Sequence, residues 1–157
     1  MAKYDIEQLL TDIETILKAN LNTKILAVSA DKGDGIVLKP ISASAYITQS
    51  LNMKMMKYDP FVLTGVSAIE SGTSGPGCSQ VPTIQIMVIM ADGGRADLLS
   101  RLLRYQRALL EVIQENFSKI PEASNLSIES LVPVAIEDIN SSAPFRGIGI
   151  AVKAAIA

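Results

Sequence analysis

The sequence contains no histidine and only one cysteine, Cys78, among its 157 residues. Without histidine, the usual base of serine and cysteine nucleophiles and the commonest transition-metal ligand are both missing. A single cysteine excludes an intrachain disulfide and a cysteine-rich zinc site. Its glycine-rich surroundings offer no basic neighbour that would favour a reactive thiolate. We therefore predict that the chain is not an enzyme and holds no cofactor or metal.

Basic charge and long apolar runs are also scarce. The chain has 14 basic and 16 acidic residues and a net charge of −2, whereas a nucleic-acid-binding domain is usually strongly basic. The longest apolar run, Ile86–Ala91, is far shorter than the roughly 20 residues of a membrane helix. The first residues, MAKYDIEQ, are polar and acidic and predict no signal peptide. We expect neither specific DNA binding nor membrane insertion.

Hydrophobic residues, by contrast, make up 48% of the chain, and charged residues only 19%. The length fits a single domain over residues 1–157. A chain of this size can bury a core without disulfides or metals. A lone domain this apolar is expected to cover part of its surface with partners.

Two segments have the apolar spacing of amphipathic helices. The first is predicted over Tyr4–Ala19 and the second over Arg95–Phe117. In the second, Arg101 and Arg104 are expected opposite the apolar face. That face is predicted to consist of Leu98, Leu99, Leu102, Leu103, Leu109, Leu110, Ile113 and Phe117. Asp92 or a neighbour is the expected helix cap, with an anion site at the helix start as the alternative.

The segment after the first helix has the features of strands. We predict a strand at Lys24–Ala30 that pairs as a hairpin with Ile36–Lys39, around a turn of sequence DKGDG. The two aspartates of this turn lack the spacing of a calcium loop. Ile41–Gln49 is expected to continue in extended form, and Phe61–Glu70 to form another strand.

The second half of the sheet is predicted to contain its central strand, Thr83–Ala91, covered on both faces. A closing hairpin follows, with arms at Leu126–Asp138 and Phe145–Ile156. Pro133 cannot donate a ladder hydrogen bond, so its strand is an edge strand or is bulged there. One face of the last strand has small residues that allow close approach of another element: Gly147, Gly149, Ala151 and Ala155.

The expected fold class is therefore α+β. One mixed or antiparallel sheet is packed by two amphipathic helices, in the order α-β-β-(β)-β-β-α-β-β. No internal repeat and no long linker divides the chain.

Two loops are candidate partner surfaces. The first is an apolar and basic segment that either fills gaps in its own fold or docks on a neighbour. It comprises Met53, Lys54, Met55, Met56 and Lys57. The second is the loop Ser71–Gln80, which contains Gly72, Gly75 and Gly77. It lacks the lysine and following helix of a phosphate loop. We predict that it is mobile in the free subunit and becomes ordered against a partner chain.

Arginines recur along the second helix, at Arg95, Arg101, Arg104 and Arg107. Arg107 and Glu111 are spaced for an ion pair within the helix. A solvated helix face is the ordinary interpretation, and an ion-pair seam between subunits is the alternative. The acidic residues Glu111 and Glu115 nearby disfavour contact with DNA.

The order of elements resembles the tail terminator, or tail completion, proteins of long-tailed bacteriophages. The resemblance covers nearly the whole chain. It is carried by the segments DIEQLLTDIETILKA, PTIQIMVIMAD, LLRYQRALLEVIQ, LVPVAIEDI and FRGIGIAVKAAI. It implies a six-membered ring that caps the finished tail tube, stops its polymerisation and offers a surface to the head connector.

The implied partners are other copies of the chain, the tail tube protein and the head connector or neck protein. DNA would pass through the ring without specific binding. The implied location is the tail-neck region of the virion, reached from the host cytoplasm during assembly. The family contributes no catalytic residues.

Two alternatives remain open at this point. One is a neck adaptor or head-completion protein, and the other is a small cytoplasmic α+β domain that binds a ligand. The number of subunits separates them, because six fits a terminator, twelve an adaptor and two a small cytoplasmic protein.

Overall fold

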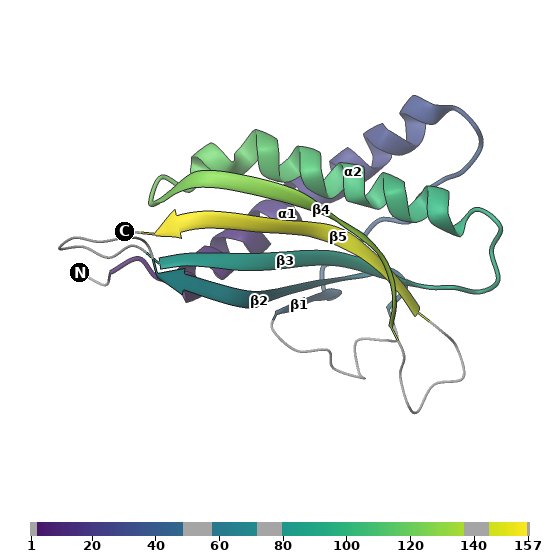
Figure 1. Cartoon of the computed structure of the whole chain (residues 1–157). Helices are drawn as coiled ribbons and strands as arrows, with labels where there is room; N and C mark the ends of the chain where they lie inside the picture. Colours follow the sequence, from purple (N-terminus) through teal and green to yellow (C-terminus); the bar gives the residue numbers. More distant parts are fainter. Residues whose placement is uncertain (1–2, 49–57, 72–79, 137–144, 157) are drawn as a thin grey trace.

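The computed structural model describes residues 3–48, 58–71, 80–136 and 145–156. Within these ranges, two long helices lie on the same face of a five-stranded sheet (Figure 1). The strand order is β1-β2-β3-β5-β4. The strands are β1 (Tyr46–Thr48), β2 (Phe61–Ser71), β3 (Gln80–Ala91), β4 (Ala123–Ile136) and β5 (Phe145–Ile156). Only the β1–β2 pair is parallel among these described strands. The predicted α+β class, one mixed sheet with two helices, is confirmed.

Helix α1 (Ile6–Lys32) is much longer than the sequence indicated. The Asp5 carboxylate caps its start by accepting a hydrogen bond from the Gln8 N–H, at 2.9 Å. Gly33 ends it with a φ of 57°, a left-handed conformation that glycine adopts without strain. The predicted strand at Lys24–Ala30 is therefore wrong. Those residues continue the apolar spacing of the helix and bury Ile25 and Val28.

Two asparagines lie just beyond the predicted end of the helix at Ala19, and the structure gives each a different role. Asn20 donates its side-chain N–H to the carbonyl of Ile16 one turn earlier, at 2.9 Å. Asn22 holds the returning chain, because its amide both donates to and accepts from the backbone of Ile41. The asparagines thus belong within α1, and the predicted end near Ala19 is wrong.

The chain from residue 33 to residue 45 forms no strand, so the predicted hairpin with Ile36–Lys39 is also wrong. Several of its backbone groups bond to side chains of the helices, and only its last residue, Ala45, bonds to a strand, by accepting from the Val62 N–H of β2 at 2.8 Å. The Ser29 hydroxyl donates to the Ile36 carbonyl and accepts from the Leu38 N–H, both at 3.1 Å. The predicted extended segment 41–49 is reduced to β1 within its described part.

Strand β3 lies in the middle of the sheet, as predicted. Alternate residues Ile84, Ile86 and Val88 are fully buried beneath the helices. The prediction that both faces are covered is confirmed at Ile89, which is fully buried. It is wrong at Met87, which is only half-buried on the face without helices. We call this second face the open face of the sheet.

Helix α2 (Leu98–Asn116) begins three residues later than expected, and a short 3-10 turn, η2 (Phe117–Lys119), follows it. Asp92 is not its cap. The Asp92 carbonyl accepts from the Arg95 N–H, and the Arg95 carbonyl accepts from the Leu98 N–H, so a turn precedes the helix. Asp97 stands at the N-cap position instead, without a capping hydrogen bond from its side chain.

The apolar face of α2 is rotated from the predicted one. Leu102, Leu109 and Ile113 are buried as expected. Leu99 and Leu103, predicted on the same face, are 57% and 47% exposed. Other residues of α2 fill the core contact in place of these two leucines, namely Tyr105, Ala108 and Val112.

The closing hairpin of β4 and β5 is confirmed, and β4 lies at the edge of the sheet. The pairing register shifts between Leu131 and Val134. Pro133 falls inside that shift, so its strand is both an edge strand and bulged, as its missing N–H predicted. Strand β4 begins at Ala123, three residues before the predicted start at Leu126.

Candidate interaction surfaces

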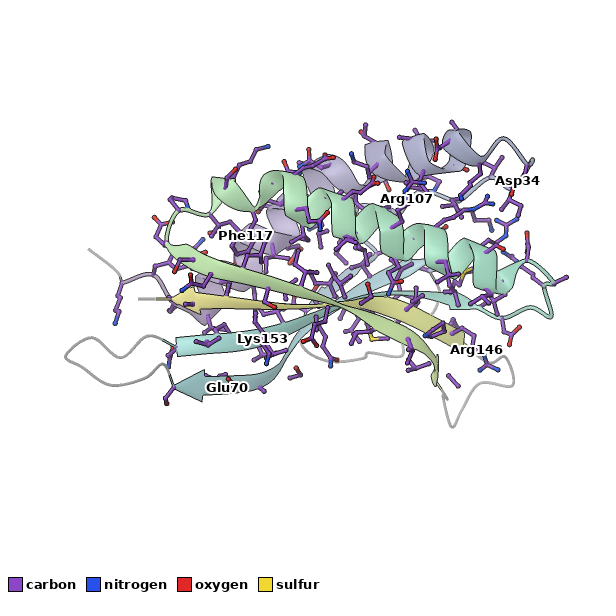
Figure 2. The ribbon with its side chains drawn as sticks, turned by 45° about the horizontal axis from the view of Figure 1, so that its top comes forward. Asp34, Glu70, Arg107, Phe117, Arg146 and Lys153 are labelled. Atoms are coloured by element: carbon purple, nitrogen blue, oxygen red, sulfur yellow. The ribbon has the colours of Figure 1, made fainter. Side chains whose placement is uncertain are left out.

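The arginines of α2 attach that helix to the end of α1. Arg104 donates through Nη1 to Asp34 Oδ1 at 3.0 Å, and its Nη2 also contacts the same carboxylate. Its side chain is only 9% exposed, contrary to the predicted solvent-facing position. The hydrogen bond from Arg104 lowers the pKa of the Asp34 carboxyl to about 2. Figure 2 shows Asp34 at the end of α1 and Arg107 between the helices.

Two neighbouring arginines make similar contacts. Arg107 pairs with Asp31 at 2.9 Å and with Glu111 at 3.1 Å, so the predicted pair within α2 is confirmed. Arg101 pairs with Asp97 at 2.8 Å and donates to the Val37 carbonyl at 2.9 Å. Arg101, Arg104 and Arg107 are therefore all engaged within the chain. A seam between subunits at these arginines remains a prediction.

A polar contact missed by sequence reasoning lies at the β4 bulge. The Gln106 side chain of α2 donates from Nε2 to the carbonyls of Leu131 and Gly149, at 2.8 and 2.6 Å. It thereby satisfies two backbone acceptors beside the register shift near Pro133. The available signal was a glutamine placed between Leu103 and Leu110 on an otherwise apolar stripe.

Gly149 itself is packed against the neighbouring strand. A Cβ atom built on it would lie 2.0 Å from the Ile86 carbonyl oxygen and 2.9 Å from the Met87 Cα. The small-residue face predicted for β5 does allow close approach at this position. The approaching element is the backbone of β3 within the same sheet.

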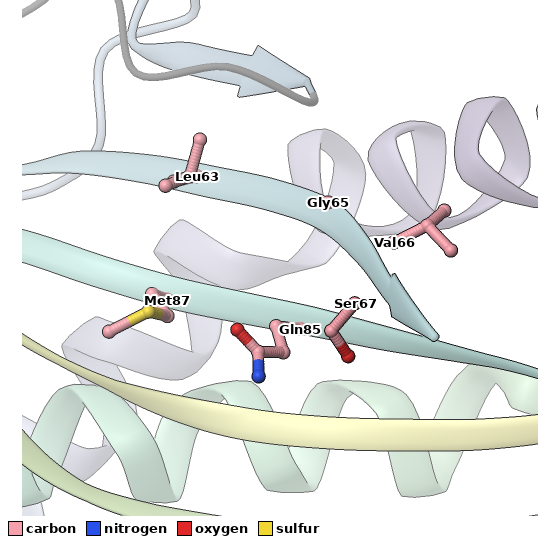
Figure 3. Close-up of a pocket in the computed structure, with 6 residues that line it drawn as sticks. All are labelled: Leu63, Gly65, Val66, Ser67, Gln85 and Met87. Atoms are coloured by element: carbon pink, nitrogen blue, oxygen red, sulfur yellow. The ribbon is translucent and has the colours of Figure 1, made fainter. Parts of the chain in front are cut away.

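The open face of the sheet has a shallow hollow of about 210 Å³ (Figure 3). It is lined by Leu63, Gly65, Val66, Ser67, Gln85 and Met87. These side chains are small, apolar or neutral, and none of them ionises in the ordinary pH range. Ligand pockets usually measure about 300–1,000 Å³. The hollow is thus a poor match for a small-molecule site.

A second hollow, of about 270 Å³, lies where α1 passes into the following coil. It is lined by Leu26, Ser29, Ala30, Gly33, Gly35, Ile36 and Val37. Leu26 is 60% exposed and Val37 is 67% exposed. We call this apolar depression the α1 groove.

On the other side of the helix layer, exposed apolar side chains gather beside the edge strand. Leu99 and Leu103 of α2 lie on this side, and Val132 of the neighbouring β4 is 74% exposed. Gln106 relates the helix to the strand, because it follows Leu103 on the same stripe and bonds to Leu131. Val134 pairs with Gly147, which pairs with Ile89, so it lies on the open face of the sheet instead. We call Leu99, Leu103, Val132 and the outer edge of β4 the β4 flank.

The two candidate loops lie largely outside the described residues. Met53, Lys54, Met55, Met56 and Lys57 fall there, as do Gly72, Gly75, Gly77 and Cys78. Ser71 and Gln80 are described and form the last pair between β2 and β3, where both are exposed. Strands β2 and β3 therefore flank the predicted loop.

Comparisons with known proteins found no matching family model and no matching curated protein. In the described part of the chain, no group of three or more acidic or cysteine side chains is arranged to hold a metal ion. The described helices include none that is both long and apolar enough to cross a membrane.

Proposed function

We propose that the chain is a structural virion protein that forms a ring of six copies at the head-proximal end of a phage tail. The observation that carries the proposal is the exposed β4 flank. It combines a fourteen-residue edge strand with the exposed side chains of Leu99, Leu103 and Val132. Edge strands of this length are usually covered or blunted, because their free N–H and C=O groups pair readily with another chain.

The α+β architecture supports the proposal because it is the one that the resemblance to tail terminators implies. Pro133 and two register shifts blunt β4 near its two ends. Between them Glu129 is the only charged residue, so charge repulsion scarcely protects the middle of this edge. Burial between neighbouring copies would remove the exposed leucines and Val132 from water, which is favourable in proportion to their apolar area. A ring would thus account for the apolar surplus of the sequence.

In this function, one face of the ring meets the last ring of the tail tube, and the other meets the head connector or neck protein. The ring stops tube growth because it offers no further tube-like surface. DNA passes through its centre without specific binding. No catalytic step is required, and none of the chain's residues is assigned one.

A neck adaptor or head-completion protein is the second candidate, because the β4 flank would serve a ring of another size equally well. A small ligand-binding domain is less well supported. The hollow on the open face measures about 210 Å³, which is below the range of about 300–1,000 Å³ for ligand pockets.

Deletion of the gene from the phage tests the proposal directly. We expect DNA-filled heads together with unattached tails of irregular length, as seen by electron microscopy. Expression of the intact gene from a plasmid should restore normal virions and serves as the control. Normal-length tails with heads that leak DNA would favour the head-completion role. Normal virions without the protein would refute both structural roles.

The number of subunits gives an independent measurement. Purified protein should form rings of six under conditions that promote assembly, as counted in class averages of electron micrographs. Rings of twelve would support an adaptor, and a stable dimer would support a small cytoplasmic protein.

A further inference from the structure

We propose that neighbouring copies join head to tail, with the β4 flank of one copy seated against the α1 groove of the next. This inference rests on the proposed ring and names its contact surfaces. A ring with different faces toward tube and connector must be polar. A polar ring uses two different patches on each subunit, whereas a two-fold contact joins a patch to its own copy.

The two patches lie on opposite flanks of the helix layer. Lys24 faces α2, because it pairs with Glu115 of that helix at 2.8 Å. Leu26 is about 200° further around α1 and therefore points away from α2. Arg104 faces α1 through Asp34. Leu99, about 140° around α2 from Arg104, points away from α1 and toward the β4 side.

The ends of the β4 flank can be placed as well. Gln106 lies beside Leu131 of β4. Helix α2 and strand β4 run in opposite directions over the sheet (Figure 1). Leu103 and Leu99, which precede Gln106, therefore lie toward the Val132–Val134 end of the strand. Leu99, Leu103 and Val132 form the apolar ridge of this flank.

The ridge and the groove are both apolar and differ in shape, as two contacting surfaces must. The β4 flank projects branched apolar side chains, and the α1 groove is a depression of about 270 Å³ with Leu26 and Val37 at its rim. Leucine and valine side chains fit a space of this size. Neither the groove lining nor the three ridge residues include a charged side chain that the contact would strip of water.

The helix and the edge strand that carry the two patches are similar in length. The twenty-seven residues of α1 extend about 40 Å at 1.5 Å per residue. The fourteen residues of β4 extend about 45 Å at 3.3 Å per residue. With the leucines of α2 beside it, the β4 flank covers about 45 Å by about 15 Å, or roughly 700 Å². Each partner in a specific interface contributes about 800 Å².

Cross-linking of mixed variants tests the contact. In a Cys78→Ser background, Leu26→Cys and Leu103→Cys are purified separately, because both positions are exposed and tolerate substitution. A bis-maleimide with a reach of about 10 Å (a typical spacing between packed elements) is added to each variant and to their mixture under assembly conditions. We expect covalent dimers in the mixture and none with either variant alone.

Thr11→Cys in place of Leu26→Cys is the matched control. Thr11 is also exposed on α1, but it lies about 22 Å along the helix from Leu26. Cross-linking of Leu103→Cys to itself would overturn the proposal in favour of a two-fold contact. An assembled protein that gives no mixed product, or a chain that stays monomeric under all conditions, would also overturn it.

A second test places opposite charges at the two positions that the contact brings together, Leu26 and Leu103. Leu26→Asp and Leu103→Lys should each weaken self-assembly at least about tenfold, because each buries an unpaired charge in the contact. An equimolar mixture should restore assembly, since copies can alternate so that Lys meets Asp. Failure of the mixture to assemble better than the separate variants would contradict the proposed contact.

These measurements distinguish a failure of the proposed contact from a failure of the proposed function. Mixed cross-links in a protein whose deletion leaves normal virions would support the contact and refute the phage role. Rings of six without mixed cross-links would support the ring and refute the contact.

Discussion

Gly149→Ala should destabilise the protein more than the same change at Gly33, Gly35, Gly93 or Gly94. The added Cβ would lie 2.0 Å from the Ile86 carbonyl oxygen. Real Cβ atoms do not approach a backbone oxygen so closely, and no side-chain rotation can relieve the clash, because the obstacle is the main chain of β3. Strands β3 and β5 would have to separate at this point. The Gln106 side chain of α2 also donates a hydrogen bond to the Gly149 carbonyl there.

The expected cost is at the upper end of the range for overpacking, about 3 kcal/mol or more. A change of 1 kcal/mol shifts the melting temperature of a domain of this size by about 2–4 °C. We therefore expect Gly149→Ala to lower the melting temperature by about 6–12 °C or more. Urea unfolding, monitored by circular dichroism, measures the change in the free energy of unfolding. A thermal melt measures the change in melting temperature.

Gly94→Ala is the matched control. Gly94 has a φ of 67°, and a Cβ atom added to it would have no neighbouring atom within 4 Å, so the substitution costs backbone strain alone. That strain amounts to about 1–2 kcal/mol. The two variants thus compare a clash with a strained turn. If Gly149→Ala lost no more stability than Gly94→Ala, the close approach of β3 to β5 would be wrong.

Three other substitutions test separate parts of the fold. Leu102→Asp should unfold the domain, because an unpaired buried charge costs several kcal/mol and the whole free energy of unfolding is only about 5–15 kcal/mol. A soluble, folded variant would show that the buried face of α2 is misassigned. Gln106→Leu should cost about 1–3 kcal/mol in urea unfolding, because two carbonyls, including that of Leu131, lose their donor; an unchanged midpoint would argue against this contact. Asp34→Asn should change acid unfolding. Its pKa falls from 3.8 to about 2 in the folded protein, so the pair with Arg104 stabilises fully above about pH 4 and is lost as the pH falls through about 2. The stability difference between wild type and variant should therefore shrink over that interval, and a difference that stayed constant down to about pH 2 would contradict the assignment.

The parts of the fold predicted correctly depend on signals that lie within short segments. Strand β3 is a long alternating run of branched residues, so its identity and central place follow from composition and pattern. Pro133 has no N–H in any environment, so its effect on β4 follows from covalent structure alone. Arg107 and Glu111 are neighbours on any helix that contains both.

The errors arise where distant segments decide the structure. Asn20 and Asn22 are common near helix ends, but here Asn22 bonds to Ile41, a residue distant in the sequence. The buried Ile25 and Val28 carry α1 past them. Leu99 and Leu103 have helical spacing, but the position of α1 and β4 determines which side of α2 is buried. The bonds of Gln106 at the bulge join three elements, and no local pattern contains them.

The contact between Gln106 and Gly149 has a consequence for finding distant relatives of the chain. Apolar residues in a core can exchange with one another while the fold persists. A glycine required by a main-chain neighbour and a glutamine that serves two carbonyls have few substitutes. Homologous chains that keep the bulge should therefore retain a helical glutamine followed, 43 residues later in this sequence, by a strand glycine. Such a pair would remain recognisable after the hydrophobic pattern around it had diverged.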